Sequence, residues 1–140
     1  MKFLHSMIRV HDLDATLRFF IQGLGLKETR RMDNPAGKYT LVYLAADENP
    51  DSEIELTHNW DSSEDYGNAR NFGHLAFLVD DVYATCAHLQ WLGYTIHRPP
   101  RDGYMAFVKS PDRISVELLQ KGPALPPQEP WASMPNTGDW

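Results

Sequence analysis

The stretches LHSMIRVHDLDAT at residues 4–16 and GHLAFLVDDVYAT at residues 73–85 decide the fold, because each is a variant of the other. Placed one above the other, they agree at His5 and His74, Val10 and Val79, Asp12 and Asp81, Ala15 and Ala84, and Thr16 and Thr85. A Leu-Gly pair follows each stretch, and each half then ends in a short run with an inner glutamate, SEIELT at 52–57 and ISVELL at 114–119. This shared order favours a duplicated module.

Each half is predicted to fold as β-α-β-β-β, which makes the chain an α+β protein built from two paired modules. Polar and apolar residues alternate over 5–10 and over 74–79, as they do in strands with one buried face. Further β-rich runs supply the remaining strands; they include residues 39–45, 52–57, 104–108 and 114–119. A turn is predicted at 110–113, where proline occupies a position that type I turns favour.

A helix is predicted after the first strand of each half. Asp12 is suited to cap the first helix, and Asp80 or Asp81 the second, because an aspartate side chain can accept from free amides at a helix start. The residues expected to face the core, from their helical spacing, are Leu13, Leu17, Phe20 and Leu24 in the first helix and Val82, Cys86 and Leu89 in the second.

Residues 1–121 are predicted to form one domain, with module one at about 1–60, a polar loop at 61–71 and module two at about 72–121. From residue 122 onward the composition changes, because prolines that exclude helix and strand recur up to residue 135. Trp131 and Trp140 are too apolar for a free tail. We therefore expect an extended C-terminal arm over 122–140, packed on this subunit or on a second one, with a disordered tail as the alternative.

Composition excludes several classes of protein. The formal net charge of −6 argues against a nucleic-acid binder, which usually carries a basic face. No apolar run approaches the roughly 18 residues that a membrane span needs, and the first residues lack the pattern of a signal peptide. Cys86 is the single cysteine, so a reducing compartment, the cytoplasm, is expected.

Four residues in matching positions of the repeat are candidate metal ligands: His5, Glu55, His74 and Glu117. A pseudo-twofold arrangement of the modules would bring them together although they are far apart in sequence. Two imidazoles and two carboxylates suit Ni²⁺, Co²⁺, Zn²⁺ or Mn²⁺. Each residue alone is better explained as a satisfied or solvated polar side chain, but their matching positions favour the metal site.

On these residues the chain resembles glyoxalase I, within the vicinal oxygen chelate superfamily of glyoxalase/bleomycin-resistance-like folds. The motifs that carry the resemblance are LHSMIRVHDLDAT, KYTLVYL, EIELTHNW, FGHLAFLVDD and SPDRISVELLQ. The resemblance implies a homodimer with active sites at the subunit interface. His5 and Glu55 would then come from one subunit, and His74 and Glu117 from the other.

The resemblance also implies an activity, that of a lactoylglutathione lyase. The methylglyoxal–glutathione hemithioacetal would be isomerised to S-lactoylglutathione, which detoxifies methylglyoxal. One divalent metal per site is implied, and the short loop between the modules resembles the form that favours Ni²⁺, ahead of Co²⁺ or Zn²⁺. The positions that contact glutathione match Arg9 and Asn59, and Arg98 and Arg101 are further candidates for this basic site.

The reaction expected of these residues is a proton shift between adjacent carbons through an enediolate. A divalent metal would polarise the substrate oxygens, and a carboxylate would move the proton. Glu117 is predicted to be the main base, with Glu55 as its pseudosymmetric counterpart. No Ser-His-Asp or Cys-His arrangement competes, because Cys86 is predicted to lie in the core.

Some features depart from the family pattern, and other functions remain open. Arg113 stands where the family's turn usually has glycine, a position that often needs positive φ. The segment after Arg98 is short, which leaves the alignment of Arg98 and Arg101 open. The alternatives are a thioester epimerase, a ring-cleaving dioxygenase, which the second carboxylate at Glu55 argues against, and a metal-free antibiotic-binding resistance protein, which usually lacks these four ligands.

Overall fold

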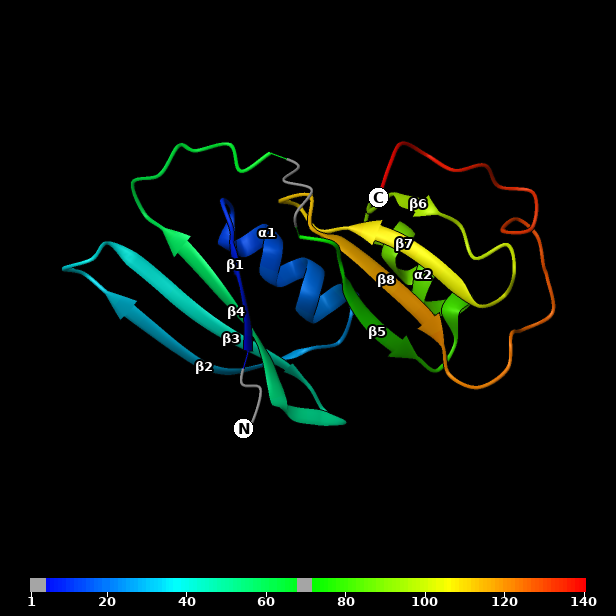
Figure 1. Ribbon diagram of the computed structural model, residues 1–140, viewed down its shortest axis with the longest axis horizontal. Helices are drawn as coiled ribbons and strands as arrows, with labels where there is room; N and C mark the ends of the chain where they lie inside the picture. Colours follow the sequence, from blue (N-terminus) through cyan, green and yellow to red (C-terminus); the bar gives the residue numbers. More distant parts are fainter. Residues whose placement is uncertain (1–4, 68–71) are drawn as a thin grey trace. The chain divides into compact units, whose positions relative to one another are not determined.

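The computed structural model describes residues 5–67 and 72–140 (Figure 1). The chain divides into two compact units, Met1–Gly67 and Asn68–Trp140, and each unit holds one four-stranded sheet. The second unit includes the predicted arm, and the predicted loop at 61–71 lies partly outside the described residues. No helix within the described ranges is long and apolar enough to cross a membrane.

The first unit has a mixed sheet with strand order β1-β4-β3-β2. Only the pair formed by β1 and β4 is parallel; the other neighbours are antiparallel. The elements are β1 (His5–Arg9), α1 (Leu13–Leu17), η1 (Arg18–Gly23), β2 (Lys27–Asn34), β3 (Tyr39–Ala46) and β4 (Asn49–Asn59).

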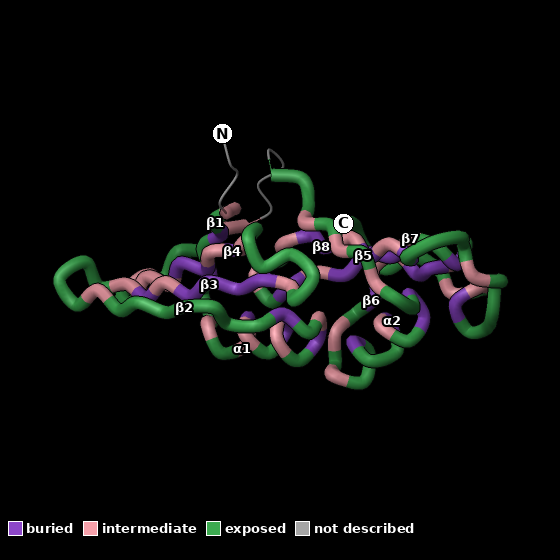
Figure 2. Tube along the Cα trace, turned by 90° about the horizontal axis from the view of Figure 1, so that it is seen from below, coloured by how far each residue is buried: buried purple, intermediate pink, exposed green. Residues whose placement is uncertain are grey.

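The second unit repeats this topology with strand order β5-β8-β7-β6, in which β5 and β8 are parallel. Its elements are β5 (Leu75–Val79), α2 (Val82–Trp91), β6 (Ile96–Arg98), β7 (Met105–Lys109) and β8 (Ser115–Gln120). The predicted β-α-β-β-β modules are therefore confirmed. Figure 2 shows that each helix lies against one face of its own sheet, which leaves the opposite face for other side chains.

The first helix begins as predicted but packs differently. Asp12 accepts a hydrogen bond from the amide of Ala15 at 2.9 Å, as an N-cap should. After Leu17 the helix widens into π turns, and the amide of Leu24 donates to the carbonyl of Phe19 at 3.2 Å. The predicted stripe is therefore only partly right. The fully buried side chains of this helix are Thr16, Phe19 and Phe20, whereas Leu13, Leu17 and Leu24 are half-buried.

The second helix follows the prediction closely. Asp81, rather than Asp80, is the N-cap, and it accepts from the amide of Ala84 at 2.9 Å. The predicted core residues Val82, Cys86 and Leu89 are all fully buried. Burial raises the pKa of the Cys86 thiol to about 12, so this thiol stays protonated and behaves as a core side chain.

The predicted turn between β7 and β8 places a non-glycine residue in the left-handed backbone conformation, which glycine favours. Arg113 has a φ of 64°, although it is not glycine. Its amide donates to the carbonyl of Ser110 at 2.9 Å, and the amide of Ser110 donates to the carbonyl of Ile114 at 2.9 Å. The hairpin therefore keeps its hydrogen bonds and carries the strain at one residue.

The C-terminal arm, residues 122–140, has turns but no helix or strand, and it packs on the second module of its own chain. Trp131 is buried, with only 4% of its surface exposed. The hydroxyl of Tyr83 in α2 donates to the carbonyl of Pro126 at 3.1 Å. In this structure the arm thus contacts the second module of its own chain.

A close backbone approach seats the start of the arm. The amide of Leu125 donates to the carbonyl of Gly103 at 2.9 Å. A Cβ atom at Gly103 would lie 1.9 Å from the carbonyl oxygen of Leu125, and this glycine has a φ of +69°. Only glycine satisfies both the contact and the backbone conformation.

Candidate metal centre

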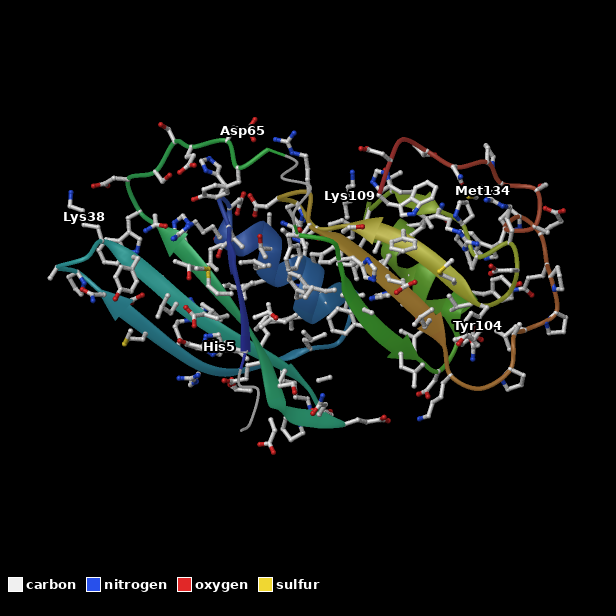
Figure 3. The ribbon with its side chains drawn as sticks, in the orientation of Figure 1. His5, Lys38, Asp65, Tyr104, Lys109 and Met134 are labelled. Atoms are coloured by element: carbon white, nitrogen blue, oxygen red, sulfur yellow. The ribbon has the colours of Figure 1, made fainter. Side chains whose placement is uncertain are left out.

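The first module brings His5 and Glu55 together on the exposed face of its sheet. His5 (labelled in Figure 3) begins β1, and Glu55 lies in β4, the parallel neighbour of β1. His5 Nε2 is 3.0 Å from Glu55 Oε2. The His5 side chain is 34% exposed and that of Glu55 only 12%, so the carboxylate is the more enclosed partner.

The second module repeats this pair. His74 lies one residue before β5, and Glu117 lies in β8. His74 Nε2 is 3.1 Å from Glu117 Oε2. The four predicted ligands therefore occur as two pairs with nearly the same geometry, one in each unit.

In each pair the histidine packs against an aromatic ring that the sequence analysis did not predict. His5 meets Tyr43 edge to face with ring centroids 5.8 Å apart, and His74 meets Phe107 in the same way at 5.5 Å. Tyr43 lies opposite Glu55 across strands β3 and β4, and Phe107 lies opposite Glu117 across β7 and β8. Both rings occupy matching positions of the repeat, but this match depends on the register between strands, which the sequence pattern does not give.

The two carboxylates are not held equally. Burial raises the pKa of Tyr43, and hydrogen bonding of its side chain to Glu55 raises it further. The hydroxyl of Thr57 also donates to Glu55 Oε1, at 3.3 Å. Glu117 faces Phe107, which has no hydroxyl, and its one recorded polar contact within the described residues is His74. Glu117 is therefore the freer carboxylate.

In the first module, further contacts stabilise Tyr43 and Glu53. The guanidinium of Arg30 lies 3.4 Å from the centroid of the Tyr43 ring, in a cation–π contact. Arg30 also donates to Glu53 Oε2 at 2.8 Å, and the hydroxyl of Thr29 donates to Glu53 Oε1 at 2.5 Å. The hydrogen bond from Arg30 lowers the pKa of Glu53, and that from Thr29 adds to the effect.

The donor atoms fit a divalent metal. Two ligand atoms that each lie about 2.1 Å from a metal at right angles are about 3 Å apart, which is the spacing of both pairs. Imidazole nitrogen and carboxylate oxygen together suit first-row divalent ions. Across residues 5–67 and 72–140, no three His, Cys, Asp or Glu side chains gather as one metal site.

Two of the predicted substrate-binding residues lie together in the first module. Arg9, at the end of β1, donates from Nη1 to Asn59 Oδ1 at 3.3 Å. Arg9 is exposed and Asn59 is half-buried at the end of β4. This contact leaves most of the guanidinium donors of Arg9 directed toward solvent, where they can meet a ligand.

Arg98 has its charge balanced within the second module. It donates to the carbonyl of Met105 and, at 2.8 Å, to Asp102 Oδ2. Burial opposes ionisation of Asp102, but the hydrogen bond from Arg98 and those from the amides of Met105 and Tyr104 together lower its pKa. Arg98 therefore fixes the loop between β6 and β7.

Arg101 is joined to the arm instead. Its Nη1 donates to the carbonyl of Met134 at 3.0 Å and to Asn136 Oδ1 at 2.8 Å. Both partners are uncharged, so the positive charge of Arg101 is not balanced by them. The four predicted substrate residues thus separate into a contacting pair, Arg9 and Asn59, and two arginines that hold a loop and the arm.

Comparisons with known proteins identify the family of this chain. The profile of the Glyoxalase/Bleomycin resistance protein/Dioxygenase superfamily matches residues 2–118. A probable lactoylglutathione lyase of Vibrio cholerae is 41% identical over 125 residues, which cover 85% of this chain and 90% of the relative. A lactoylglutathione lyase of Neisseria meningitidis serogroup A is 41% identical over 128 residues, which cover 86% and 91% of the two chains.

Among solved structures, the trypanothione-dependent glyoxalase I of Leishmania major superposes with a TM-score of 0.79. It is 38% identical in sequence, and the match covers 86% of each chain. The predicted fold class is thereby confirmed by relatives as well as by topology. With its profile match over most of the sequence and its repeated His–Glu pairs, this chain belongs to the Glyoxalase/Bleomycin resistance protein/Dioxygenase superfamily.

Proposed function

We propose that this chain is a lactoylglutathione lyase, which isomerises the hemithioacetal of methylglyoxal and glutathione to S-lactoylglutathione. The observation that carries the proposal is the duplicated His–Glu pair, at 3.0 Å in one module and 3.1 Å in the other. The names of the relatives support the same reaction. A cytoplasmic setting agrees with the single, buried cysteine.

The proposed site joins both pairs around one divalent metal, with His5 and Glu55 from one subunit and His74 and Glu117 from its partner in a homodimer. Such a metal polarises the substrate oxygens and stabilises the negative charge that develops on them. Ni²⁺ is the first choice and Co²⁺ or Zn²⁺ the next, because the loop between the modules is short, as in the form that favours nickel.

Glu117 is the proposed base. It removes the proton from the carbon that carries the sulfur and returns it to the adjacent carbonyl carbon, so that the substrate is isomerised without an external oxidant or reductant. The contacts of Glu55 support this choice, because hydrogen bonding to Tyr43 and Thr57 holds Glu55 while Glu117 contacts only His74 in the described part of the chain.

Arg9 and Asn59 are the proposed contacts for glutathione, because a guanidinium and an amide suit the carboxylates and peptide groups of that ligand. Arg101 would add positive charge from the second module, since its present partners are uncharged. Arg98 would contribute only if glutathione displaced Asp102, so we expect it to contribute least.

The decisive experiment follows thioester formation from methylglyoxal and glutathione by ultraviolet absorbance. Protein stripped of metal should be inactive, and Ni²⁺ or Co²⁺ should restore the highest activity. Glu117→Gln should lower kcat by about 10²- to 10⁴-fold, the usual contribution of a general base. Glu64→Gln, on an exposed loop, is the matched control and should leave kcat unchanged.

Other outcomes would point to other functions. Tight metal binding without thioester formation, from either glutathione or trypanothione, would reject the substrate and favour thioester epimerisation. Absence of metal binding would reject the enzyme and favour a binding protein. Full activity of Glu117→Gln would reject Glu117 as the base.

A further inference from the structure

We propose that Trp140 is a positioning residue for the second His–Glu pair, and that residues 134–140 form a clasp that holds Trp140 in place. The proposal rests on the proposed function, because that function makes His74 a metal ligand. Trp140 acts through Phe107, on which it stacks, and Phe107 in turn packs against His74.

The contacts form a short relay from the clasp to the pair. The rings of Trp140 and Phe107 lie nearly parallel, 30° apart in orientation, with centroids separated by 5.9 Å. Phe107 meets His74 edge to face and lies directly across the strands from Glu117. Phe107 is buried, so the indole covers a ring that touches the imidazole and adjoins the carboxylate.

The register of the two sheets explains why module two needs this cover. In module one, Arg30 of β2 lies opposite Tyr43 and places its guanidinium over that ring. In module two, Arg98 of β6 lies opposite Phe107 in the equivalent position. Arg98 instead donates to Asp102 and to the carbonyl of Met105, so its guanidinium binds the loop between β6 and β7. The ring of Phe107 is covered by the indole of Trp140.

The clasp is fixed to the second module at both of its ends. At its start, Arg101 donates to the carbonyl of Met134 and to Asn136. At its end, Lys109 of β7 lies 3.1 Å from Asp139 Oδ1, and 13% of the lysine side chain is exposed. In Figure 3, Met134 lies at the start of the clasp and Lys109 lies beside the final residues of the chain.

Between these ends the clasp pairs with the edge of the sheet. The amide of Thr137 donates to the carbonyl of His97 in β6 at 2.8 Å, and His97 Nδ1 is 2.7 Å from the carbonyl oxygen of Thr137. Gly138 then turns the chain with a φ of +68°. Figure 1 shows the red end of the chain beside β6 and β7. At this end the ring of Trp140 stacks on that of Phe107.

A fixed imidazole binds a metal more tightly because less side-chain freedom is lost on binding. The His74 side chain is 42% exposed and has a carboxylate on one side and the ring of Phe107 on another. Removal of the indole would loosen Phe107 and thereby His74. Trp140 acts through Phe107, so it is a positioning residue and not a catalytic one.

The first test measures Ni²⁺ affinity by calorimetry and the visible spectrum of the Co²⁺-loaded protein. Trp140→Ala should weaken Ni²⁺ binding by about threefold to tenfold, the scale of an aromatic contact, and should alter the Co²⁺ spectrum. Trp140→Phe should restore most of both. Trp91→Ala is the matched control, because Trp91 is 80% exposed on α2, and it should change neither measurement.

A second measurement separates this inference from the proposed function. In metal-free protein, the ring signals of His74 in NMR spectra, assigned with His74→Gln, should shift in Trp140→Ala and stay unchanged in Trp91→Ala. Unchanged His74 signals, or Ni²⁺ affinity and Co²⁺ spectra equal to those of the wild type, would overturn the role of Trp140. A wild-type protein that binds no metal but shows the NMR shift would overturn the proposed function and leave the positioning role intact.

Discussion

One hydroxyl group distinguishes the surroundings of the two glutamates. The interaction of the Tyr43 hydroxyl with Glu55 helps to raise the pKa of Tyr43. The equivalent ring of Phe107 has no hydroxyl, and within the described residues the polar contact of Glu117 is with His74. A carboxylate that moves a proton between two carbons must change partners during the reaction. On this difference we propose the static role for Glu55 and the mobile role for Glu117.

Phe107→Tyr tests this assignment. The new hydroxyl should bond to Glu117 and hold it, and a hydrogen bond worth about 0.5–1.5 kcal/mol should lower kcat by about threefold to tenfold. Steady-state kinetics should show the change in kcat with little change in KM. Tyr104→Phe, an exchange of the same two side chains at an exposed position, is the control. An unchanged or higher kcat in Phe107→Tyr would show that Glu117 needs no such freedom.

At the scale of single elements, the hairpin between β7 and β8 stores strain at Arg113. A non-glycine residue with left-handed backbone costs about 1–2 kcal/mol, and glycine loses about 0.5–1 kcal/mol more chain entropy on folding. Arg113→Gly should therefore raise the free energy of unfolding by about 0.5–1 kcal/mol, as measured by urea denaturation.

Arg113→Ala is the matched control for this hairpin, because it removes the guanidinium and keeps the strained backbone. The comparison between glycine and alanine isolates the backbone effect from the loss of side-chain contacts. Equal stability of the two variants would contradict the strain at this residue.

The elements also show what the sequence could and could not predict. Periodicity and capping residues placed β1, β3, β4, β5, β7, β8 and both helix starts, because these signals are local. They gave no residue range for β2 or β6. They misassigned part of the first helix, since a π segment does not follow the period of 3.6 residues and buries both Phe19 and Phe20. The repeat pointed to the His and Glu residues because each has a chemically unusual side chain in a matching position.

The aromatic layer of the site could not be predicted in the same way. Tyr43 and Phe107 matter through the residues opposite them on neighbouring strands, and the alternation within one strand does not give the register between strands. The guanidinium of Arg30 lies over the ring of Tyr43, whereas that of Arg98 binds the carboxylate of Asp102. This difference becomes visible only in three dimensions.

At the scale of the whole molecule, each compact unit holds one His–Glu pair, which is half of the proposed ligand set. A complete site of four ligands can then arise from both units of one chain or from units of two chains. The proposed homodimer takes the second course, and its symmetry makes the two arrangements distinguishable by experiment.

Coexpression of His5→Ala with His74→Ala provides that experiment. If sites form between subunits, a mixed dimer holds one intact site, and random pairing should restore about a quarter of wild-type activity. Each variant alone should be inactive. Purified mixed dimers with no activity would show instead that each chain completes its own site.

The contact between Gly103 and Leu125 should constrain how related sequences evolve. A side chain at position 103 would collide with the carbonyl of Leu125, so a lineage that replaced this glycine could no longer seat the arm along this path. The identity of this one residue in a relative should therefore record whether its ancestors kept the docked arm. Where the glycine has been replaced, selection on the tryptophan at the far end of the arm should have lapsed as well.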